Sequence, residues 1–204
     1  MDRGSKFHSY AMPVSSEAEV AEALQKLKKL HPKARHFCSA LRLFPDASLE
    51  RSNDDGEPSG SAGKPILGQI IKYNLTNTLI VVVRYFGGTK LGVPGLIEAY
   101  KTSAANAIEL NQILEKKLYG TITMEISYQQ HPALLNHLKQ SDIPVLQESF
   151  ADRAEITIAL PKSSMKEDFK QMLHNFSKMD FADTQAYLDF LDIKASMSDQ
   201  DLIR

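Results

Sequence analysis

Apolar and polar positions alternate along the chain in a way that predicts two groups of strands and helices. In the first group, strands are indicated by alternating or continuous apolar runs and helices by apolar residues three or four apart. The predicted elements are a strand at 7–13, a helix from Ser15 or Ser16 to about 31, a strand at 35–44, a helix beginning near 63–65, a strand at 78–84 and a helix at 96–110. The 78–84 run is nearly continuous in apolar, β-branched residues, so we expect a central strand covered on both faces.

A boundary between domains is indicated at residues 115–120, and the apolar pattern beyond it predicts a second group of strands and helices. Its elements are a strand at 121–128, a helix at 131–140, strands at 143–150 and 155–160, and a helix at 165–176, with room for a final strand. This order is typical of the ferredoxin-like split arrangement. We therefore expect an α+β protein with domains at 1–117 and 118–204, and a frayed tail at 199–204.

Two polar, glycine-rich loops, at 45–62 and 86–95, each follow a strand and precede a helix. Eight of the ten glycines lie between Gly56 and Gly95. Glycine allows backbone N–H groups to approach a ligand, and a helix start adds unpaired N–H donors and partial positive charge. With Lys64, Arg84 and Lys90 nearby, the loops predict a site for a phosphate-like or carboxylate-like anion. The equal alternative is that tight turns alone require the glycines. The spacing matches neither a Walker loop nor a dinucleotide fingerprint.

Three carboxylates in the first loop, Asp54, Asp55 and Glu57, complicate this interpretation. They can hold a hard cation, act as acid and base, or pair with Arg84 and Lys90 while capping N–H groups. We favour the third use, because their spacing matches no defined calcium loop. No metal and no cofactor are therefore predicted.

Candidate nucleophiles are weakly indicated. Residues 61–64 read Ser-Ala-Gly-Lys, a Ser-x-x-Lys spacing that places a serine beside a lysine in some acyl enzymes, but its companion motifs are not evident. His36 and Cys38 share one strand face, although a lone cysteine is more often a small buried hydrophobe. We expect His36 to contact the loop acids, and we predict no complete catalytic constellation.

Composition and charge narrow the class of protein. Hydrophobic residues make up 43% of the chain and charged residues 24%, which is typical of a globular protein. The longest apolar run, 78–83, is too short for a membrane span of about 20 residues, the first residues lack the apolar core of a secretory signal, and one cysteine excludes an intramolecular disulfide. These features favour the cytoplasm.

The charge is unevenly distributed along the chain. Through Tyr119 the chain carries 16 Lys and Arg against 12 Asp and Glu, a balance of +4, and from Gly120 onward 8 against 13, a balance of −5. A mildly basic first half favours an anionic partner, although ordinary scatter in composition explains the difference equally well.

Three segments closely resemble the signature of the IMPACT/YigZ family: ARHFCSA at 34–40, DDGEPSGSAG at 54–63 and RYFGGTKLG at 84–92. The second half resembles the C-terminal domain of the bacterial members. The resemblance implies a first domain with the fold of domain 2 of ribosomal protein S5, followed by a ferredoxin-like domain similar to domain V of elongation factor G. It also implies a link to translational control, known for the eukaryotic relatives, and nucleic-acid or ribosome binding by fold analogy. The eukaryotic partner system is not carried over to this architecture.

The chain departs from the family pattern at the second loop. Pro94 stands where the family has a glycine, and Glu98 stands where it has a basic residue. The first change removes an N–H donor and the second removes positive charge. Both weaken an anion site at that helix start.

These observations lead to one preferred function and two alternatives. The preferred function is a non-enzymatic protein that contacts RNA or the ribosome and is linked to translation regulation, with Phe86 or Tyr85 stacking on an unpaired base. One alternative is a hydrolase-like enzyme acting on a small anionic or peptide-like substrate between the two loops. The other is a protein-binding regulator that uses the acidic C-terminal domain. No membrane partner is predicted, and the oligomeric state is not indicated. The candidate ligand-binding or nucleic-acid-binding residues are His36, Asp54, Asp55, Glu57, Ser59, Ser61, Lys64, Arg84, Phe86, Gly87, Gly88 and Lys90.

Overall fold

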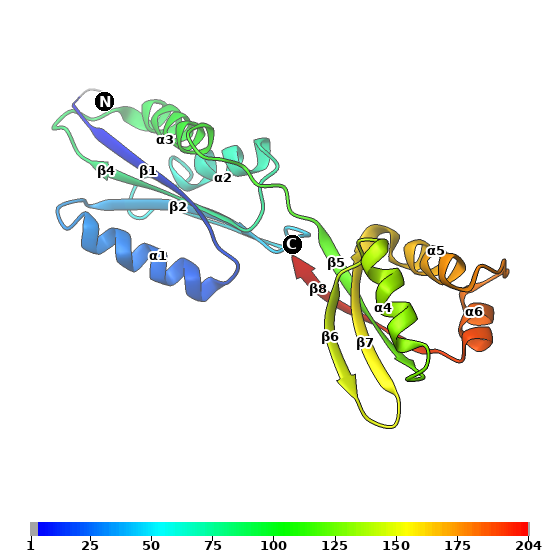
Figure 1. Cartoon of the computed structure of the whole chain (residues 1–204). Helices are drawn as coiled ribbons and strands as arrows, with labels where there is room; N and C mark the ends of the chain where they lie inside the picture. Colours follow the sequence, from blue (N-terminus) through cyan, green and yellow to red (C-terminus); the bar gives the residue numbers. More distant parts are fainter. Residues whose placement is uncertain (1–3, 204) are drawn as a thin grey trace. The chain divides into compact units, whose positions relative to one another are not determined.

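The computed structural model describes residues 4–203 and divides the chain into two compact units, Met1–Leu114 and Glu115–Arg204 (Figure 1). The sequence pattern placed this division after residue 117. Each unit contains one four-stranded sheet with its own hydrophobic core.

The first unit is a layered α/β structure around an antiparallel sheet. Its elements are β1 (Lys6–Pro13), α1 (Glu17–Leu30), β2 (His36–Leu43), β3 (Leu49–Asn53), α2 (Gly63–Lys72), β4 (Thr78–Tyr85) and α3 (Gly92–Glu109). The strand order is β1-β4-β2-β3. This is the ribosomal protein S5 domain 2-like class that the resemblance implied.

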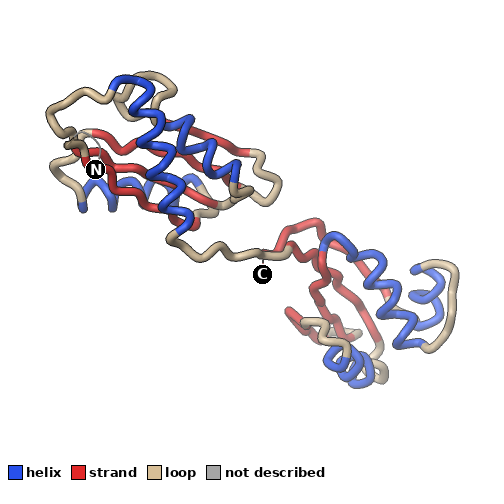
Figure 2. Tube along the Cα trace, turned by 90° about the horizontal axis from the view of Figure 1, so that it is seen from above, coloured by secondary structure: helices blue, strands red, loops and turns tan. Residues whose placement is uncertain are grey.

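Strand β4 is central and buried at all but its two end residues, which confirms the expectation from its continuous apolar run. Because side chains alternate across a strand, Leu79, Val81 and Val83 join one core cluster, while Ile80 and Val82 join another. Helix α1 covers the first cluster, and helices α2 and α3 cover the second (Figures 1 and 2). The sheet is thereby covered on both faces.

The ends of α1 follow the local chemistry of the sequence. Ser16 caps the helix by accepting the N–H of Glu19 at 3.3 Å, and the Glu19 carboxylate accepts the Ser15 N–H at 2.8 Å. The arrangement is a variant of the capping box, because Glu19 bonds the residue before the N-cap instead of the N-cap itself. At the other end the helix stops at Leu30, just before His31 and Pro32, as the proline predicts.

Two predictions for the first unit were wrong. The polar 45–62 segment is not a single loop, because Leu49–Asn53 forms the edge strand β3 paired with β2. Four of its five residues are exposed, so it carries no apolar alternation to reveal it. Helix α3 begins at Gly92 instead of residue 96, and Pro94 occupies its first turn, where the missing N–H costs nothing.

The second unit has the ferredoxin-like fold. Its elements are β5 (Leu118–Ile126), α4 (His131–Gln140), β6 (Val145–Phe150), β7 (Ala154–Pro161), a short 3-10 turn (Lys162–Ser164), α5 (Met165–Ser177), α6 (Thr184–Leu191) and β8 (Lys194–Ile203). The strand order β6-β7-β5-β8 is antiparallel throughout and places the last strand beside the first. The core lies between this sheet and its helices.

Two further predictions are corrected here. Helix α6 was not predicted; it is only 8 residues long and begins at an N-cap, Asp183, whose carboxylate accepts the Ala186 N–H at 2.9 Å. The tail at 199–204 was expected to be frayed, but the backbone through Ile203 belongs to β8, where Leu202 and Ile203 pair with β5, and Arg204 lies outside the described residues. Among residues 4–203, no helix combines the length and apolarity needed to cross a membrane.

Candidate functional site

The first glycine loop is folded around the carboxylate of Asp54. One of its oxygens accepts the N–H of Gly60 at 2.7 Å, and the other accepts those of Ala62 and Gly63 at 2.9 and 2.8 Å. Burial alone would raise the pKa of Asp54, but these three N–H donors, with the charge of Lys64, lower it below its ordinary value. Asp54 therefore satisfies the N–H groups at the start of α2, a helix whose N-cap, Ala62, has no side chain to do so.

Asp55 and His36 attach the same loop to strand β2. The Asp55 carboxylate accepts the Phe37 N–H at 2.7 Å, and the Asp55 carbonyl accepts from Nδ1 of His36 at 2.9 Å. Asp55 has a left-handed backbone with φ of 42°, followed by Gly56 with φ of 86°. His36 thus contacts the loop through the backbone of Asp55.

Glu57 and Arg84 form a buried ion pair that joins the two loops. Arg84 Nη1 donates to Glu57 Oε1 at 2.6 Å, and the side chains are only 6% and 4% exposed. Tyr100, on α3, donates to the same oxygen at 2.9 Å, while Arg84 Nη2 donates to Ser5 Oγ at 3.3 Å. The guanidinium also lies 5.5 Å from the ring centroid of Phe86. Glu57 comes from the first loop and Arg84 ends β4 just before the second, so this network fixes both.

The loop acids therefore hold the loop in place. Two parts of the favoured prediction are confirmed, because Asp54 caps N–H groups and Glu57 pairs with Arg84. The expected pair with Lys90 is not formed within the described structure. No cluster of three His, Cys, Asp or Glu side chains suited to a metal ion is present among the described residues.

The candidate nucleophiles are held in inert positions. Cys38 is fully buried, its thiol donates to the Asp54 carbonyl at 2.9 Å, and burial raises its pKa to about 12. A thiol with that pKa is not ionised at neutral pH. Ser61 is also fully buried and donates to the Pro58 carbonyl at 2.6 Å, whereas Lys64 is exposed. The Ser-x-x-Lys spacing therefore does not bring a base to the serine hydroxyl in this conformation.

The remaining candidates face solvent. They are Ser59, Lys64, Phe86, Gly87, Gly88 and Lys90. Phe86 is 53% exposed, whereas Tyr85 turns inward and its hydroxyl lies 2.9 Å from Nδ1 of His31. Of the two aromatic candidates, only Phe86 presents much of its ring to solvent.

Sequence reasoning missed two residues of this site, Tyr100 and Ser5. Tyr100 lies at core spacing in α3, and only its hydroxyl reaches Glu57. Ser5 accepts from both Arg84 and the Gly87 N–H, each at 3.3 Å. Tyr100 matches the tyrosine of the family pattern at 91–100, but neither residue has a spacing that indicates ligand binding or catalysis, so neither was predicted as part of the site.

Comparison with known proteins places both units in one family. The family model "Impact N-terminal domain" matches residues 3–108, and "Domain of unknown function (DUF1949)" matches residues 124–178. IMPACT family member YvyE of Bacillus subtilis is 37% identical over 151 residues, covering 74% of this chain and 70% of YvyE. IMPACT family member YigZ of Escherichia coli is 33% identical over 163 residues, covering 78% of this chain and 79% of YigZ. A solved structure described as "Crystal structure of an hypothetical protein" superposes with a TM-score of 0.63 at 28% identity, covering 87% of both chains. The chain belongs to the IMPACT family.

Proposed function

We propose that this protein is a non-enzymatic binding protein whose first unit contacts RNA, free or in the ribosome, in a role linked to translation regulation. One observation carries the proposal: the three carboxylates of the first loop are engaged by N–H groups or by Arg84, whereas Lys64 and Lys90 face solvent. The two loops therefore present lysine ammonium groups at their surface, although the first is rich in acids by composition. That surface suits phosphate.

The exposed residues divide into two kinds of contact. Lys64 and Lys90 donate to phosphates, with the backbone at Gly87 and Gly88 and the hydroxyl of Ser59 close by in sequence. Phe86 stacks on an unpaired base, because its ring is half exposed and lies over the buried Arg84 guanidinium.

The remaining candidates, which are buried or half-buried, act by holding these contacts in place. They are His36, Asp54, Asp55, Glu57, Ser61 and Arg84. Since the Arg84 guanidinium is committed to Glu57 and Ser5, we assign it the role of a positioning residue and not of a phosphate ligand.

Affinity should be modest. The first unit is only mildly basic, and Glu98 lies exposed in α3, where its carboxylate pairs with Lys101 at 3.4 Å. Pro94 removes one N–H donor at the same helix start. The support from relatives is the link of the eukaryotic members to translational control, which the family resemblance implies for the first domain.

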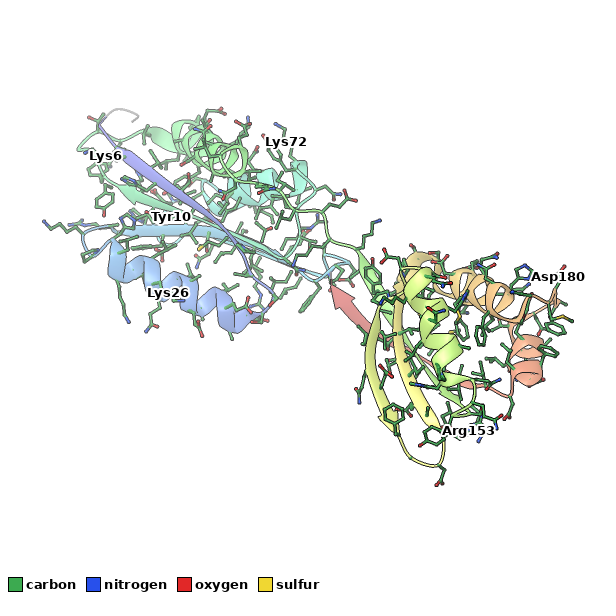
Figure 3. All side chains as sticks on the ribbon, viewed as in Figure 1. Lys6, Tyr10, Lys26, Lys72, Arg153 and Asp180 are labelled. Carbon is green, nitrogen blue, oxygen red and sulfur yellow. The ribbon has the colours of Figure 1, made fainter. Side chains whose placement is uncertain are left out.

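The test is co-sedimentation with ribosomes and with tRNA over a salt series. We compare the wild type with Lys64→Ala/Lys90→Ala and with Lys26→Ala/Lys72→Ala, which removes the same charge from exposed positions on α1 and α2 (Figure 3). The loop variant should weaken binding and reduce the logarithmic salt slope by about two, since each phosphate contact contributes roughly 0.9. The control should keep the wild-type slope. Absence of binding at low salt, or equal losses in both variants, would contradict the proposal.

A further inference from the structure

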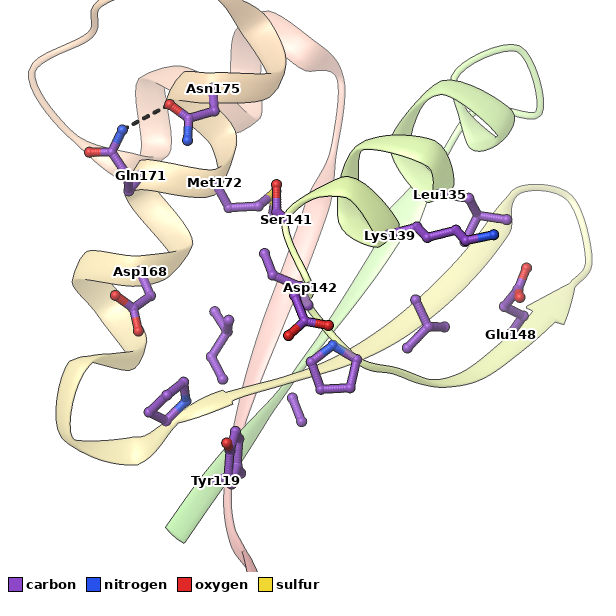
Figure 4. Close-up of a pocket in the computed structure, with 16 residues that line it drawn as sticks. Tyr119, Leu135, Lys139, Ser141, Asp142, Glu148, Asp168, Gln171, Met172 and Asn175 are labelled. Atoms are coloured by element: carbon purple, nitrogen blue, oxygen red, sulfur yellow. Dashed lines mark hydrogen bonds between the residues drawn. The ribbon is translucent and has the colours of Figure 1, made fainter. Parts of the chain in front are cut away.

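The second unit contains a groove that the RNA proposal does not use. It has a volume of about 900 Å³ and is bounded by the end of α4, the turn at 141–145, the end of β7 and α5 (Figure 4). A hollow of this volume is in the range of ligand sites in proteins. Every residue that lines it belongs to the second unit.

The groove combines apolar lining residues with a rim of charged groups. Its apolar lining includes Leu135, Ile143, Val145, Leu160 and Met172. Its charged groups are Lys139, Asp142, Glu148 and Asp168, three carboxylates against one ammonium group. Figure 4 shows Asp142 between the α5 wall, which carries Asp168, and the side of the groove that carries Lys139 and Glu148. The groove therefore favours a ligand with apolar and cationic parts.

The three carboxylates differ in the side chains that already contact them. Glu148 lies 2.9 Å from Nε2 of His131, and Asp168 accepts from the Ser164 hydroxyl at 2.7 Å. The Asp142 carboxylate has no hydrogen bond or ion pair within the described structure, and the residue is exposed. A carboxylate beside apolar residues with no cation of its own is available to one supplied by a partner.

Asp142 also occupies a backbone position that its chemistry does not favour. Its φ is 54°, and the N–H groups of Asp142 and Ile143 donate to the carbonyls of Lys139 and Leu138 at 3.3 and 2.9 Å. This is the C-terminal turn of a helix in which glycine is usual, and the helix dipole disfavours a negative charge there. Aspartate tolerates this left-handed conformation, but its negative charge opposes the dipole of α4, and that charge faces the groove.

We propose that this groove binds an extended segment of a protein partner that carries basic side chains beside apolar anchors. An RNA ligand is disfavoured because the rim is acidic and the chain from Gly120 onward carries 8 basic against 13 acidic residues. A peptide suits an open groove whose lining is mostly apolar and whose charges are few. The inference concerns the second unit alone, so it stands or falls independently of the RNA proposal.

The test uses three fluorescein-labelled heptapeptides and the full-length protein, with binding followed by fluorescence anisotropy. One peptide alternates leucine with lysine, one alternates leucine with glutamate, and one alternates glycine with lysine. Only the first combines the apolar and cationic parts, so it should bind about tenfold or more tightly than either of the others.

Variants locate the binding. Asp142→Asn/Asp168→Asn should weaken binding of the leucine–lysine peptide by about tenfold, and Gln171→Trp, on the exposed α5 wall, should obstruct the groove. The matched control Asp152→Asn/Asp180→Asn removes the same charge from exposed positions outside the groove and should bind as the wild type does. Circular dichroism verifies that each variant is folded.

Three results with the peptides would overturn the inference. They are no binding of the leucine–lysine peptide at millimolar concentration, equal affinity for all three peptides, and equal losses in the groove and control variants. Equal losses would indicate attraction to the acidic unit as a whole. As a fourth such result, loss of tRNA binding in Gln171→Trp would assign the groove to nucleic acid.

Discussion

The buried pair between Arg84 and Glu57 should dominate the stability of the first unit. Arg84→Met keeps most of the side-chain volume but leaves the Glu57 carboxylate, 4% exposed, with only the Tyr100 hydroxyl as a hydrogen-bond donor among residues 4–203. Removing one partner of a buried ion pair costs about 3–5 kcal/mol, because the other charge remains desolvated. We therefore expect the free energy of unfolding of this unit to fall by about 4 kcal/mol.

The assay is urea unfolding followed by circular dichroism, with amide hydrogen exchange in β4 to assign the loss to the first unit. A double variant, Arg84→Met/Glu57→Gln, removes both charges and should be more stable than Arg84→Met alone. Arg51→Met is the control, because Arg51 pairs with Glu17 at 2.5 Å but both side chains are more than half exposed. That pair should contribute about 1 kcal/mol or less. A cost for Arg84→Met as small as that of the control, or strict additivity in the double variant, would refute the reasoning.

Three further perturbations test other parts of the structure. Asp54→Asn should lower the free energy of unfolding of the first unit by about 1–2 kcal/mol near neutral pH. Because the folded-state pKa of Asp54 is lowered, this contribution is complete above the ordinary value of 3.8 and is lost as pH falls through the lower folded pKa, so the two unfolding curves should converge in acid. Asp142→Asn should raise the free energy of unfolding of the second unit by about 0.3–1 kcal/mol, measured by urea titration, by removing a charge from the C-terminus of α4; an unchanged or lower stability would contradict this. Gly87→Ala should lower the free energy of unfolding by more than about 2 kcal/mol, because a Cβ there would lie 1.9 Å from the Gly4 backbone. A Cβ at Gly88 meets no atom within 4 Å, so Gly88→Ala should lower it by only about 1 kcal/mol, because of the φ of 88°. Thermal unfolding of both alanine variants distinguishes these values.

The elements that the sequence predicted well are those whose burial pattern is local. Strand β4 is apolar throughout because both of its faces are covered, and α1 carries its own cap and stop signals. Strand β3 had no such signal, since it is exposed and is held by backbone pairing with β2. The end of β8 was equally hidden, because pairing with β5 orders it. Pairing between strands is a property of the fold and does not follow from the sequence of either strand alone.

The candidate site shows the same division. The acids of the first loop were predicted to cap nearby N–H groups, and the Asp54 carboxylate does accept the Gly63 N–H at the start of α2. The partnership of Glu57 with Arg84 rather than with Lys90 depends on which side chain is buried, and burial follows from the position of Arg84 at the end of the central strand. The hydroxyl of Tyr100 enters the network only because α3 packs over that strand.

The charges of the first loop explain how an acid-rich sequence can suit an anionic partner. A formal count over 54–64 gives three negative charges and one positive charge. Each carboxylate is engaged, however: Asp54 by three N–H groups, Asp55 by one, and Glu57 by Arg84 and Tyr100. These carboxylates interact most strongly with donors that lie 2.6–2.9 Å away, whereas an approaching anion meets the exposed Lys64 first. Because water and salt screen exposed charges within about 8–10 Å, the charges nearest the surface weigh most in what the loop attracts. The surface charge of such a loop therefore depends on its internal hydrogen bonds, and any substitution that frees a carboxylate should weaken phosphate binding even when it leaves both lysines in place.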